Sequence, residues 1–290
     1  MTVNNRPSAV ALGFFDGLHL GHIEVIKRAL LKDGLCSVVF TFNDKTSLPK
    51  FNGKKGQCII THEQKTRIFA GLGVERVYAP DFSDVKDFSA TEFVEKILKD
   101  ALSAAYVVCG YDFRFGKGGE GNPETLKRLC AENGIECEVV PAVAVDGVTV
   151  SSTVIRQLIR DGDIDKANRY LGYELSYDLF VKEGSRIGRT IGFPTINQEI
   201  PDYMVKPKNG VYKSWTIVDG KTYRSITNIG IKPTVDYTGD SLMETHIIGF
   251  DGDLYGHTVR VALREFIRDE VKFGSLEALK KQLEEDKSLS

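Results

Sequence analysis

Two histidines, His19 and His22, lie three residues apart in a glycine-rich segment, residues 13–22. Imidazoles one helical turn apart project to the same side, where they can hydrogen-bond phosphate oxygens. Such a pair can also stabilise the charge that moves onto a leaving pyrophosphate, with no covalent intermediate. Gly17 and Gly21 let a ligand approach the backbone without a Cβ in the way. Either histidine alone is more often an ordinary surface residue, so it is the whole segment that favours phosphate chemistry.

The elements that flank this segment place it where anions bind. The apolar run 9–12 is typical of a short buried strand, and Ile23, Ile26, Ala29 and Leu30 recur at helical spacing. The segment therefore lies at a helix N-terminus. Unpaired amide donors and the positive end of the helix dipole attract phosphates there.

Strand-like and helix-like segments alternate over the first 150 residues. Strands are expected at 9–12, 37–42, 76–79, 106–110 and 136–140, and helices from 23 to 30 and at 62–71, 91–102 and 124–133. Strands separated by helices imply right-handed crossovers and a parallel, doubly wound sheet. Ligands bind at the carboxyl ends of the strands in such sheets.

Two further polar motifs come at these strand ends. Asp112 lies among several glycines directly after a strand, and Ser152, Thr153 and Arg156 open a later helix. Hydroxyls followed by an arginine one turn later make a phosphate clamp, although Ser152 or Thr153 could equally cap that helix. The alternative for Asp112 is a surface ion pair with Arg114, and its place beside the glycines favours binding instead.

Composition and charge narrow the functional class. The 290 residues are 42% hydrophobic and 27% charged, which suits two ordinary cores. A net charge of −2 provides no basic surface for a nucleic-acid partner. No apolar run approaches the roughly 20 residues that cross a bilayer, and the N-terminus lacks the apolar core of a signal peptide. We therefore expect a cytoplasmic protein without a membrane partner.

The five cysteines form no CxxC pair and are odd in number. This pattern indicates neither a zinc site nor a disulfide framework. We expect most of them to be small buried apolar residues.

The character of the sequence changes near residue 173. A helical stretch over 152–171 ends at Gly172, and short strands broken by glycine, proline and Asp-Gly turns follow it. Several strands at close spacing predict a small antiparallel, Greek-key-like barrel. The expected domains are residues 1–172 and 173–290.

Two hairpins and a terminal helix are expected in the second domain. The first hairpin joins 211–218 to 222–226, and the second joins 244–250 to 258–263 around Asp251-Gly252. The helix is expected over about 275–285, with Leu276, Leu279 and Leu283 on its inward face.

The second domain has its own glycine-rich segment, with glycines at 184, 188 and 192. It is not a Walker A loop, because no GKS or GKT follows, yet its amides can still fold over phosphates. Thr195 and Asn197 lie two apart, so on a strand both face the same side. A hydroxyl and an amide oxygen suit Mg²⁺. Taken alone, the pair is more typical of turn residues.

Segment 13–22 resembles the HxGH signature of the nucleotidyltransferase superfamily, whose members transfer a nucleoside monophosphate to a phosphate-bearing acceptor. Six motifs resemble a riboflavin kinase domain in order and spacing: 188–197, 209–212, 228–234, 244–246, 254–256 and 266–273. The whole chain, from about residue 9 to 286, is similar to the bifunctional bacterial riboflavin kinase/FAD synthetase family. This resemblance implies a Rossmann-like adenylyltransferase domain followed by a barrel-shaped kinase domain with a C-terminal helix.

The resemblance implies two reactions that use ATP and Mg²⁺ or another divalent cation. Riboflavin is phosphorylated to FMN in the second domain, and FMN is adenylylated to FAD with release of pyrophosphate in the first. Glu244 matches the base that takes the proton from the ribityl 5′-hydroxyl, whereas by residue type alone it is a solvated edge residue. Thr195 and Asn197 match the residues that hold the metal and the nucleotide phosphates.

The remaining site residues also follow from the resemblance. In the kinase domain the implied ATP or flavin positions are Gly184, Gly188, Gly192, Pro194 and Arg268. In the adenylyltransferase domain His19 and His22 are the implied catalytic residues, and the positions around ATP are Gly13, Phe15, Asp16, Gly17, Asp112, Ser152, Thr153 and Arg156. The alternative for Arg268 is a salt bridge to Asp269 or near Glu265.

One segment departs from the family pattern. Where the family commonly continues Thr-Phe-Glu-Pro-His-Pro, this chain has Thr-Phe-Asn-Asp-Lys-Thr at residues 41–46. That loop helps shape the flavin end of the adenylylation site, so a riboflavin kinase with weakened or lost FAD synthetase activity is one alternative. Others are a nucleotidyltransferase for a different phosphorylated acceptor and a flavin-binding protein without activity. The expected partners are small-molecule substrates, and the expected state is a monomer or weak homo-oligomer.

Overall fold

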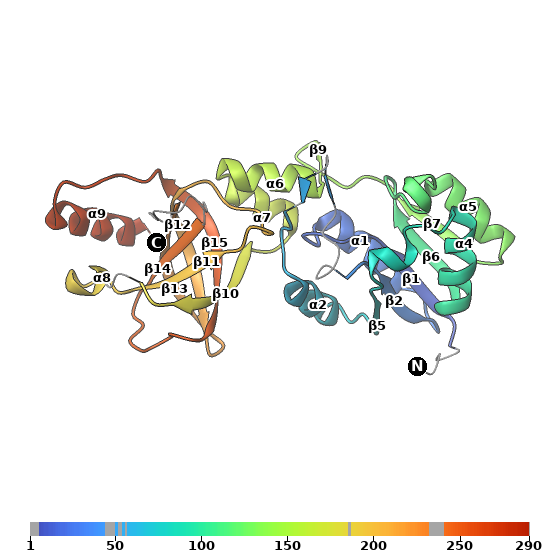
Figure 1. Cartoon of the computed structure of the whole chain (residues 1–290), viewed down its shortest axis with the longest axis horizontal. Helices are drawn as coiled ribbons and strands as arrows, with labels where there is room; N and C mark the ends of the chain where they lie inside the picture. The colour runs from blue at the N-terminus through green and yellow to red at the C-terminus, as the bar shows by residue number, and fades with distance from the viewer. Residues whose placement is uncertain are drawn as a thin grey trace. The chain divides into compact units, whose positions relative to one another are not determined.

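The computed structural model describes residues 6–43, 50–51, 54–55, 57–184, 187–231 and 241–289. The chain divides into two compact units, Met1–Ser152 and Thr153–Ser290, whose elements are labelled in Figure 1. Each unit contains its own sheet and its own apolar cluster. Compactness assigns no activity, so the domain limits of 1–172 and 173–290 stay a prediction.

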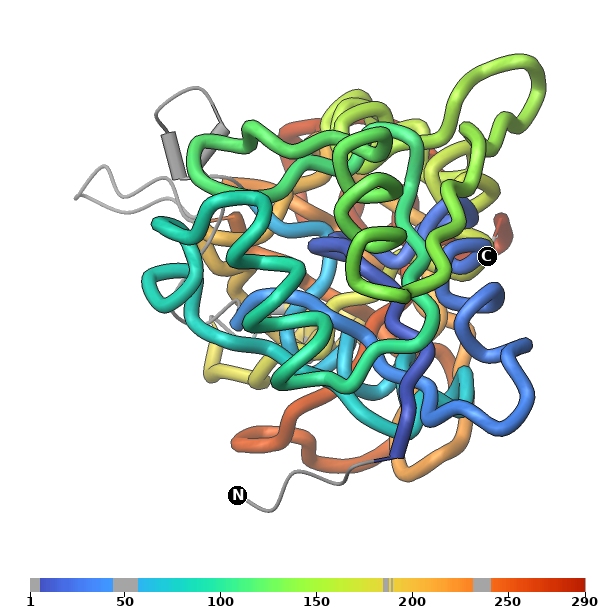
Figure 2. The backbone as a smooth tube through the Cα atoms, turned by 90° about the vertical axis from the view of Figure 1, so that its right-hand side faces the viewer, coloured from blue at the N-terminus to red at the C-terminus, as the bar shows by residue number. Residues whose placement is uncertain are grey.

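A five-stranded sheet forms the centre of the first unit, in the order β5-β2-β1-β6-β7. Its strands are β1 (Ser8–Leu12), β2 (Cys36–Phe40), β5 (Arg76–Tyr78), β6 (Ala104–Gly110) and β7 (Glu136–Val140). All four pairings between neighbours are parallel, and every residue of β1 and β2 is buried. The predicted doubly wound sheet is therefore confirmed, and Figure 2 traces its chain from blue to green.

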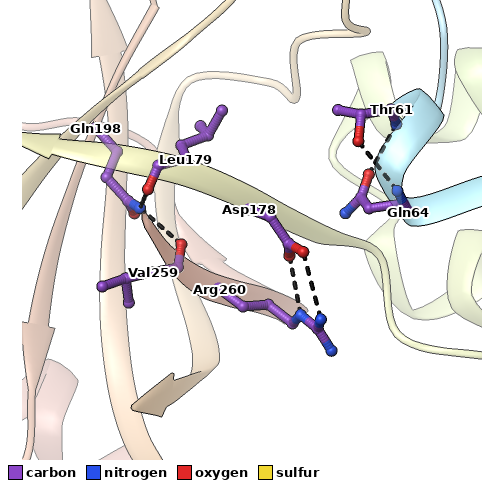
Figure 3. Close-up of polar contacts among 7 residues, drawn as sticks. All are labelled: Thr61, Gln64, Asp178, Leu179, Gln198, Val259 and Arg260. Atoms are coloured by element: carbon purple, nitrogen blue, oxygen red, sulfur yellow. Dashed lines mark hydrogen bonds and ion pairs between the residues drawn. The ribbon is translucent and has the colours of Figure 1, made fainter. Parts of the chain in front are cut away.

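Helices connect these strands as the spacing predicted. They are α1 (Leu20–Leu30), α2 (His62–Gly71), α3 (Phe82–Val85), α4 (Ala90–Glu92), which continues as π-helical turns over Phe93–Ala101, and α5 (Pro123–Glu132). The π-helical turns bury Phe93, Val94, Ile97 and Leu98 in the cluster that also holds Val10 of β1. A capping box fixes the start of α2: Gln64 N donates to Thr61 Oγ1, and Thr61 N donates to Gln64 Oε1 (Figure 3).

Short elements complete the first unit. They are a turn of 3₁₀-helix at Lys117–Gly119 and two small hairpins, β3 (Lys50–Phe51) with β4 (Lys54–Lys55) and β8 (Ala144–Val145) with β9 (Val148–Thr149). Four cysteines are buried and Cys137 is half-buried, which agrees with their expected role as small apolar residues.

The helical stretch expected over 152–171 is two helices, α6 (Ser152–Asp161) and α7 (Ile164–Leu171). The chain breaks at Gly162, whose φ of 84° lies outside the helical region. Asp163 then caps α7 by accepting from Lys166 N. The periodicity predicted the helical content, but the glycine divides it.

The second unit is built around a closed six-stranded antiparallel barrel, in the order β10-β11-β14-β13-β12-β15, as predicted. Its strands are β10 (Ser176–Lys182), β11 (Thr195–Ile200), β12 (Gly210–Val218), β13 (Lys221–Ile231), β14 (Ser241–Ile247) and β15 (Thr258–Arg268). The helices α8 (Ile187–Thr190) and α9 (Leu276–Leu289) belong to the same unit.

One of the two expected hairpins is present. β12 and β13 pair from Val218↔Lys221 onwards through the Asp219-Gly220 turn, whose φ values of 49° and 76° suit the tight turn of a hairpin. The second expected hairpin is wrong, because β14 pairs with β11 and β13 while β15 pairs with β10 and β12. The turn residues near 251 reverse the chain without pairing the strands on either side.

The expected inward face of the terminal helix is also wrong in part. Leu279 and Leu283 are half-buried, but Leu276 is 52% exposed. The buried residue of α9 is Asp286, which is 1% exposed and accepts two hydrogen bonds from Arg268. The ion pair with Arg268 of β15, together with the two half-buried leucines, therefore attaches this helix to the barrel.

Candidate functional sites

The histidine pair lies at the start of α1. His19 is the N-cap residue, and its Nδ1 accepts from His22 N at 3.3 Å. The two rings stack with centroids 3.6 Å apart, and His19 is only 6% exposed. Because Nδ1 is an acceptor, the proton of a neutral His19 is on Nε2. The local fold thus selects the tautomer that can donate from the outer nitrogen.

The loop before the histidines has an unusual backbone. Phe15 and Leu18 have φ values of 57° and 38°, conformations that cost free energy and persist only when the surroundings hold them. A Cβ at Gly13 would come within 2.8 Å of the Phe15 ring, and one at Gly17 within 2.8 Å of Ile59. These glycines permit a tight turn rather than only a close approach by a ligand.

Asp16 and Ser152 hold this loop from inside the first unit. Asp16 is 2% exposed, and its Oδ1 accepts from Ile59 N at 2.9 Å. The Ser152 hydroxyl donates to the Asp16 carbonyl oxygen at 2.8 Å. The structure therefore brings the two sequence-predicted residues together as supports of the loop.

The remaining polar positions expected around ATP lie on two other segments of the chain. Thr153 is exposed and Arg156 is 7% exposed on α6, and both belong to the unit that starts at residue 153. Asp112 is exposed beyond β6, with its Oδ1 folded back towards Gly110. Among the described residues, Asp112 makes no ion pair with Arg114, which disfavours that alternative. The departing segment is described only as far as Asn43, which donates to Asp81 at 2.9 Å; residues 44–46 lie outside the described part.

A second cluster of polar side chains forms on the barrel. In the β11–β14 ladder Thr195 pairs with His246 and Asn197 pairs with Glu244. Glu244 also pairs with Asn228 of β13. Thr245 between them is fully buried, whereas Glu244 and His246 are half-buried. The alternation therefore directs the carboxylate and the imidazole to the opposite face from Thr245.

Glycines pack closely against this cluster. A Cβ at Gly184 would lie 2.4 Å from Asn197 Nδ2, and one at Gly188 would lie 2.2 Å from the Phe193 carbonyl oxygen. Gly192 has a φ of 86°. The three sequence-predicted glycines thus shape the entry to β11, whereas Ser185 and Arg186 lie outside the described residues.

The electrostatics of the cluster favour proton uptake at Glu244. Burial raises the pKa of the Glu244 carboxyl, the nearby Glu270 carboxylate raises it further, and a hydrogen bond from Asn228 opposes both. Asn228 Nδ2 also donates to Glu270 at 3.2 Å. Burial lowers the pKa of His246, and its Nδ1 donates to the Pro194 carbonyl at 2.9 Å. A carboxylate with a raised pKa is suited to accept a proton near neutral pH.

Sequence reasoning did not single out Asn228, His246 or Glu270. All three lie within the motifs that carried the family resemblance, which was the available signal. Only the strand register shows that Asn228 and His246 share the face of Glu244, and only the folded structure brings Glu270 near that carboxylate.

Arg268 is tied to the terminal helix. Its Nε and Nη2 donate to the Asp286 carboxylate at 3.0 and 2.7 Å, and its Nη1 donates to the Asp269 carbonyl at 3.1 Å. A salt bridge was an alternative for this residue, but the carboxylate is Asp286 rather than Asp269 or Glu265. In this structure the guanidinium anchors α9.

A cavity of about 470 Å³ meets the polar cluster at Thr195 and extends along the Thr245 face of β14. Pro194, Thr195 and Thr245 line one part of it, and the residues from Phe250 to Tyr255 line another. The segment expected to be a simple hairpin turn is therefore a wall of the cavity. A space of this size suits a nucleotide or another small molecule.

Comparison with known proteins agrees with this division into two sites. The family model described as FAD synthetase matches residues 1–154, and the one described as riboflavin kinase matches residues 171–290. A nucleotidyltransferase of the HxGH type and a flavin kinase are thus joined in one chain. The chain belongs to the family of bifunctional riboflavin kinases/FMN adenylyltransferases.

Relatives match nearly the whole chain. The bifunctional riboflavin kinase/FMN adenylyltransferase of Listeria monocytogenes is 36% identical, with 96% of this chain and 89% of the relative covered. The Bacillus subtilis enzyme of the same name is 33% identical, over 97% and 90%. A crystal structure described as a macrolide-efflux protein from Streptococcus pneumoniae has a TM-score of 0.87 and 34% identity, covering 98% and 93%. Within the described residues, we find no helix with the length and apolarity to span a bilayer.

Proposed function

We propose that this chain phosphorylates riboflavin to FMN in its barrel unit and adenylylates FMN to FAD in its first unit. The observation that carries the proposal is the register that places Glu244 between Asn197 and Asn228 on one face of the barrel. Membership of the family supports both activities.

Glu244 is the proposed base for phosphorylation. Its raised pKa suits a carboxylate that takes the proton from the ribityl 5′-hydroxyl. The hydroxyl oxygen then bonds to the γ-phosphorus of ATP, the bond to the β-γ bridging oxygen breaks, and ADP leaves. Asn228, which pairs with Glu244 in the β13–β14 ladder, is proposed to orient the carboxylate. The cavity lined by Thr195 is the proposed place for the nucleotide.

Thr195 and Asn197 are the proposed holders of a divalent cation. A hydroxyl and an amide oxygen fit Mg²⁺, which binds through few protein ligands and keeps water and phosphate in its other positions. Both residues lie on one face of β11, and Asn197 is held against Gly184. When bound, the ion would neutralise charge on the transferred phosphate. Gly184, Gly188 and Gly192 are proposed to bring backbone amides near the phosphates. Pro194 and Arg268 are proposed to lie beside ATP or the flavin.

His19 and His22 are the proposed catalytic residues for adenylylation. The Nε2 hydrogen of His19 is suited to a hydrogen bond with ATP phosphate, while the FMN phosphate oxygen attacks the α-phosphorus and pyrophosphate leaves. The other residues proposed to lie around ATP or to support its loop are Gly13, Phe15, Asp16, Gly17, Asp112, Ser152, Thr153 and Arg156. No covalent enzyme intermediate is required.

The wider assignment is also a proposal. We infer that residues 1–172 and 173–290 are the two catalytic domains, and that the protein acts in the cytoplasm on small molecules as a monomer or weak homo-oligomer. The net charge of −2 supports the absence of a nucleic-acid partner.

The decisive experiment incubates the protein with riboflavin, ATP and MgCl₂ and separates the flavins over time. We expect FMN to appear first and FAD to follow. FMN that accumulates without FAD would contradict the adenylylation, and unmodified riboflavin would indicate a different acceptor.

The Glu244→Gln variant tests the proposed base. It keeps a similar side-chain size but cannot take the proton, so FMN formation should fall by a factor of about 100 or more, within the range of general-base catalysis. FAD formation from added FMN should continue. Glu265→Gln, which removes an exposed partner of Lys213, serves as the matched control. Normal FMN formation by Glu244→Gln would exclude its role as base.

A further inference from the structure

Lys65 of α2 is a buried cation beside the histidine loop. It is 2% exposed, and its Nζ donates to the Phe14 carbonyl oxygen at 2.9 Å. The ammonium also lies 4.5 Å from the centre of the Phe14 ring. Lysine is rarely buried unless its charge is compensated. The burial of this charge against the loop therefore indicates a functional role for Lys65.

The Phe14 carbonyl that Lys65 contacts is held by two hydrogen-bond donors. Thr41 Oγ1 donates to the same Phe14 oxygen at 2.9 Å. The next residue, Phe15, has the strained φ of 57° and meets the His22 ring edge-on, with centroids 5.3 Å apart. Lys65 is therefore linked to His22 by a hydrogen bond to Phe14, the backbone from Phe14 to Phe15, and the ring contact of Phe15 with His22.

A second contact braces the same loop from the chain just before α2. Ile59 N donates to the Asp16 carboxylate, and the Ile59 side chain lies against Gly17. The loop is thus held on its Phe14 side by a cation and on its Asp16 side by a backbone amide. Strained backbone persists only where the surroundings determine it in this way.

We propose that Lys65 is a positioning residue for AMP transfer, holding the Phe14 carbonyl and thereby the turn that presents His19 and His22 to the phosphates of ATP. This inference rests on the proposed function of the first unit. Lys65 acts through the loop and not on the reacting atoms. It is distinct from the histidines, which meet the nucleotide.

The test measures kcat and the KM for ATP during FAD formation from FMN in Lys65→Met. Methionine keeps an apolar stem but removes the ammonium. We expect the KM for ATP to rise about tenfold, the effect of losing a charge-assisted hydrogen bond. A merely structural role would reduce the amount of folded unit, which lowers the apparent kcat and leaves KM unchanged. An unchanged KM for ATP would overturn the proposal.

Two further variants complete the test. Lys96→Met removes an exposed ammonium that pairs with Glu92 and lies over Phe88, so it is the matched control and should keep a normal KM. Thr41→Val removes the other donor to the Phe14 oxygen and should raise the KM for ATP in the same direction. If Lys65→Met does not fold, an unchanged KM in Thr41→Val overturns the proposal.

The outcome also separates this proposal from the function on which it rests. A wild-type chain that forms no FAD from FMN would refute the proposed adenylylation. A normal wild type with an unaltered Lys65→Met would refute only the role of Lys65. Riboflavin phosphorylation by the same chains provides a measure of active protein that does not depend on the histidine loop.

Discussion

Gly184 is required by its neighbour and not by its own backbone angles. A Cβ there would lie 2.4 Å from Asn197 Nδ2, so Gly184→Ala must push the amide of Asn197 away from its place on β11. A displacement of about 1 Å near reacting groups can cost about 100-fold in rate. We therefore expect riboflavin phosphorylation to fall by between about 10-fold and 100-fold in initial-rate assays.

Gly274 provides the matched control for this substitution. A Cβ at that position meets nothing within 4 Å, so Gly274→Ala should keep the normal rate of phosphorylation. FAD formation from added FMN should be unchanged in both variants. Full kinase activity in Gly184→Ala would show that the position of Asn197 does not matter for the reaction.

Single residues differed in how well the sequence predicted them. His19 and His22 could be found because their spacing and their glycines lie in one short segment. Lys65 could not, because its partner is a backbone carbonyl 51 residues away and a lysine on a helix is usually solvated. Asp16 was found as a polar residue in the motif, but its inward direction depends on Ile59.

At the scale of elements, a side chain supplies hydrogen bonds in the barrel where β10 and β11 pair over only two residues each. β10 and β11 pair only at Val181↔Gln198 and Lys182↔Asn197. Gln198 is fully buried, and its Nε2 donates to the Leu179 and Val259 carbonyls at 2.6 and 2.8 Å (Figure 3). The amide thus satisfies carbonyl groups of both β10 and β15.

Replacing Gln198 with methionine should destabilise the barrel. The side chain stays similar in length, but two buried carbonyls lose a donor, which costs about 1–3 kcal/mol of unfolding free energy. The single tryptophan of the chain is Trp215 on β12, so its fluorescence during urea unfolding reports on the barrel. The control, Gln157→Met on the exposed side of α6, should leave this transition in place. An unshifted transition in Gln198→Met would contradict the structural role.

The sequence predicted the elements better than their partners. Periodicity identified the strands of the parallel sheet and most strands of the barrel, because burial imposes a local pattern. It failed at β14 and β15, since an Asp-Gly turn specifies a reversal but not which strands become neighbours. It also failed in part at α9, where leucine spacing suggested an apolar face but Asp286 is held by Arg268, 18 residues earlier.

At the scale of the whole molecule, the proposed catalytic residues of the two activities, the histidines and Glu244, belong to different compact units. The first unit has its own cluster around Val10 and Val107, and the barrel has one around Val181 and Val259. A substitution in one site should therefore leave the other unit folded and active. Because a variant can lose one activity and keep the other, the transfer of FMN from one chain to another can be measured.

Two single-site variants, Glu244→Gln and His22→Asn, test this division together. Neither should convert riboflavin to FAD alone, because the first lacks the proposed base and the second lacks a proposed phosphate contact. Mixed in equal amounts with riboflavin, ATP and MgCl₂, they should form FAD after a lag in which FMN accumulates, as measured by flavin separation. The lag is expected because FMN must leave one chain and bind another at its bulk concentration, without the raised local concentration of linked sites. If the mixture yields no FAD although Glu244→Gln still adenylylates added FMN, then FMN made by the barrel is not released, and the two sites work only within one chain.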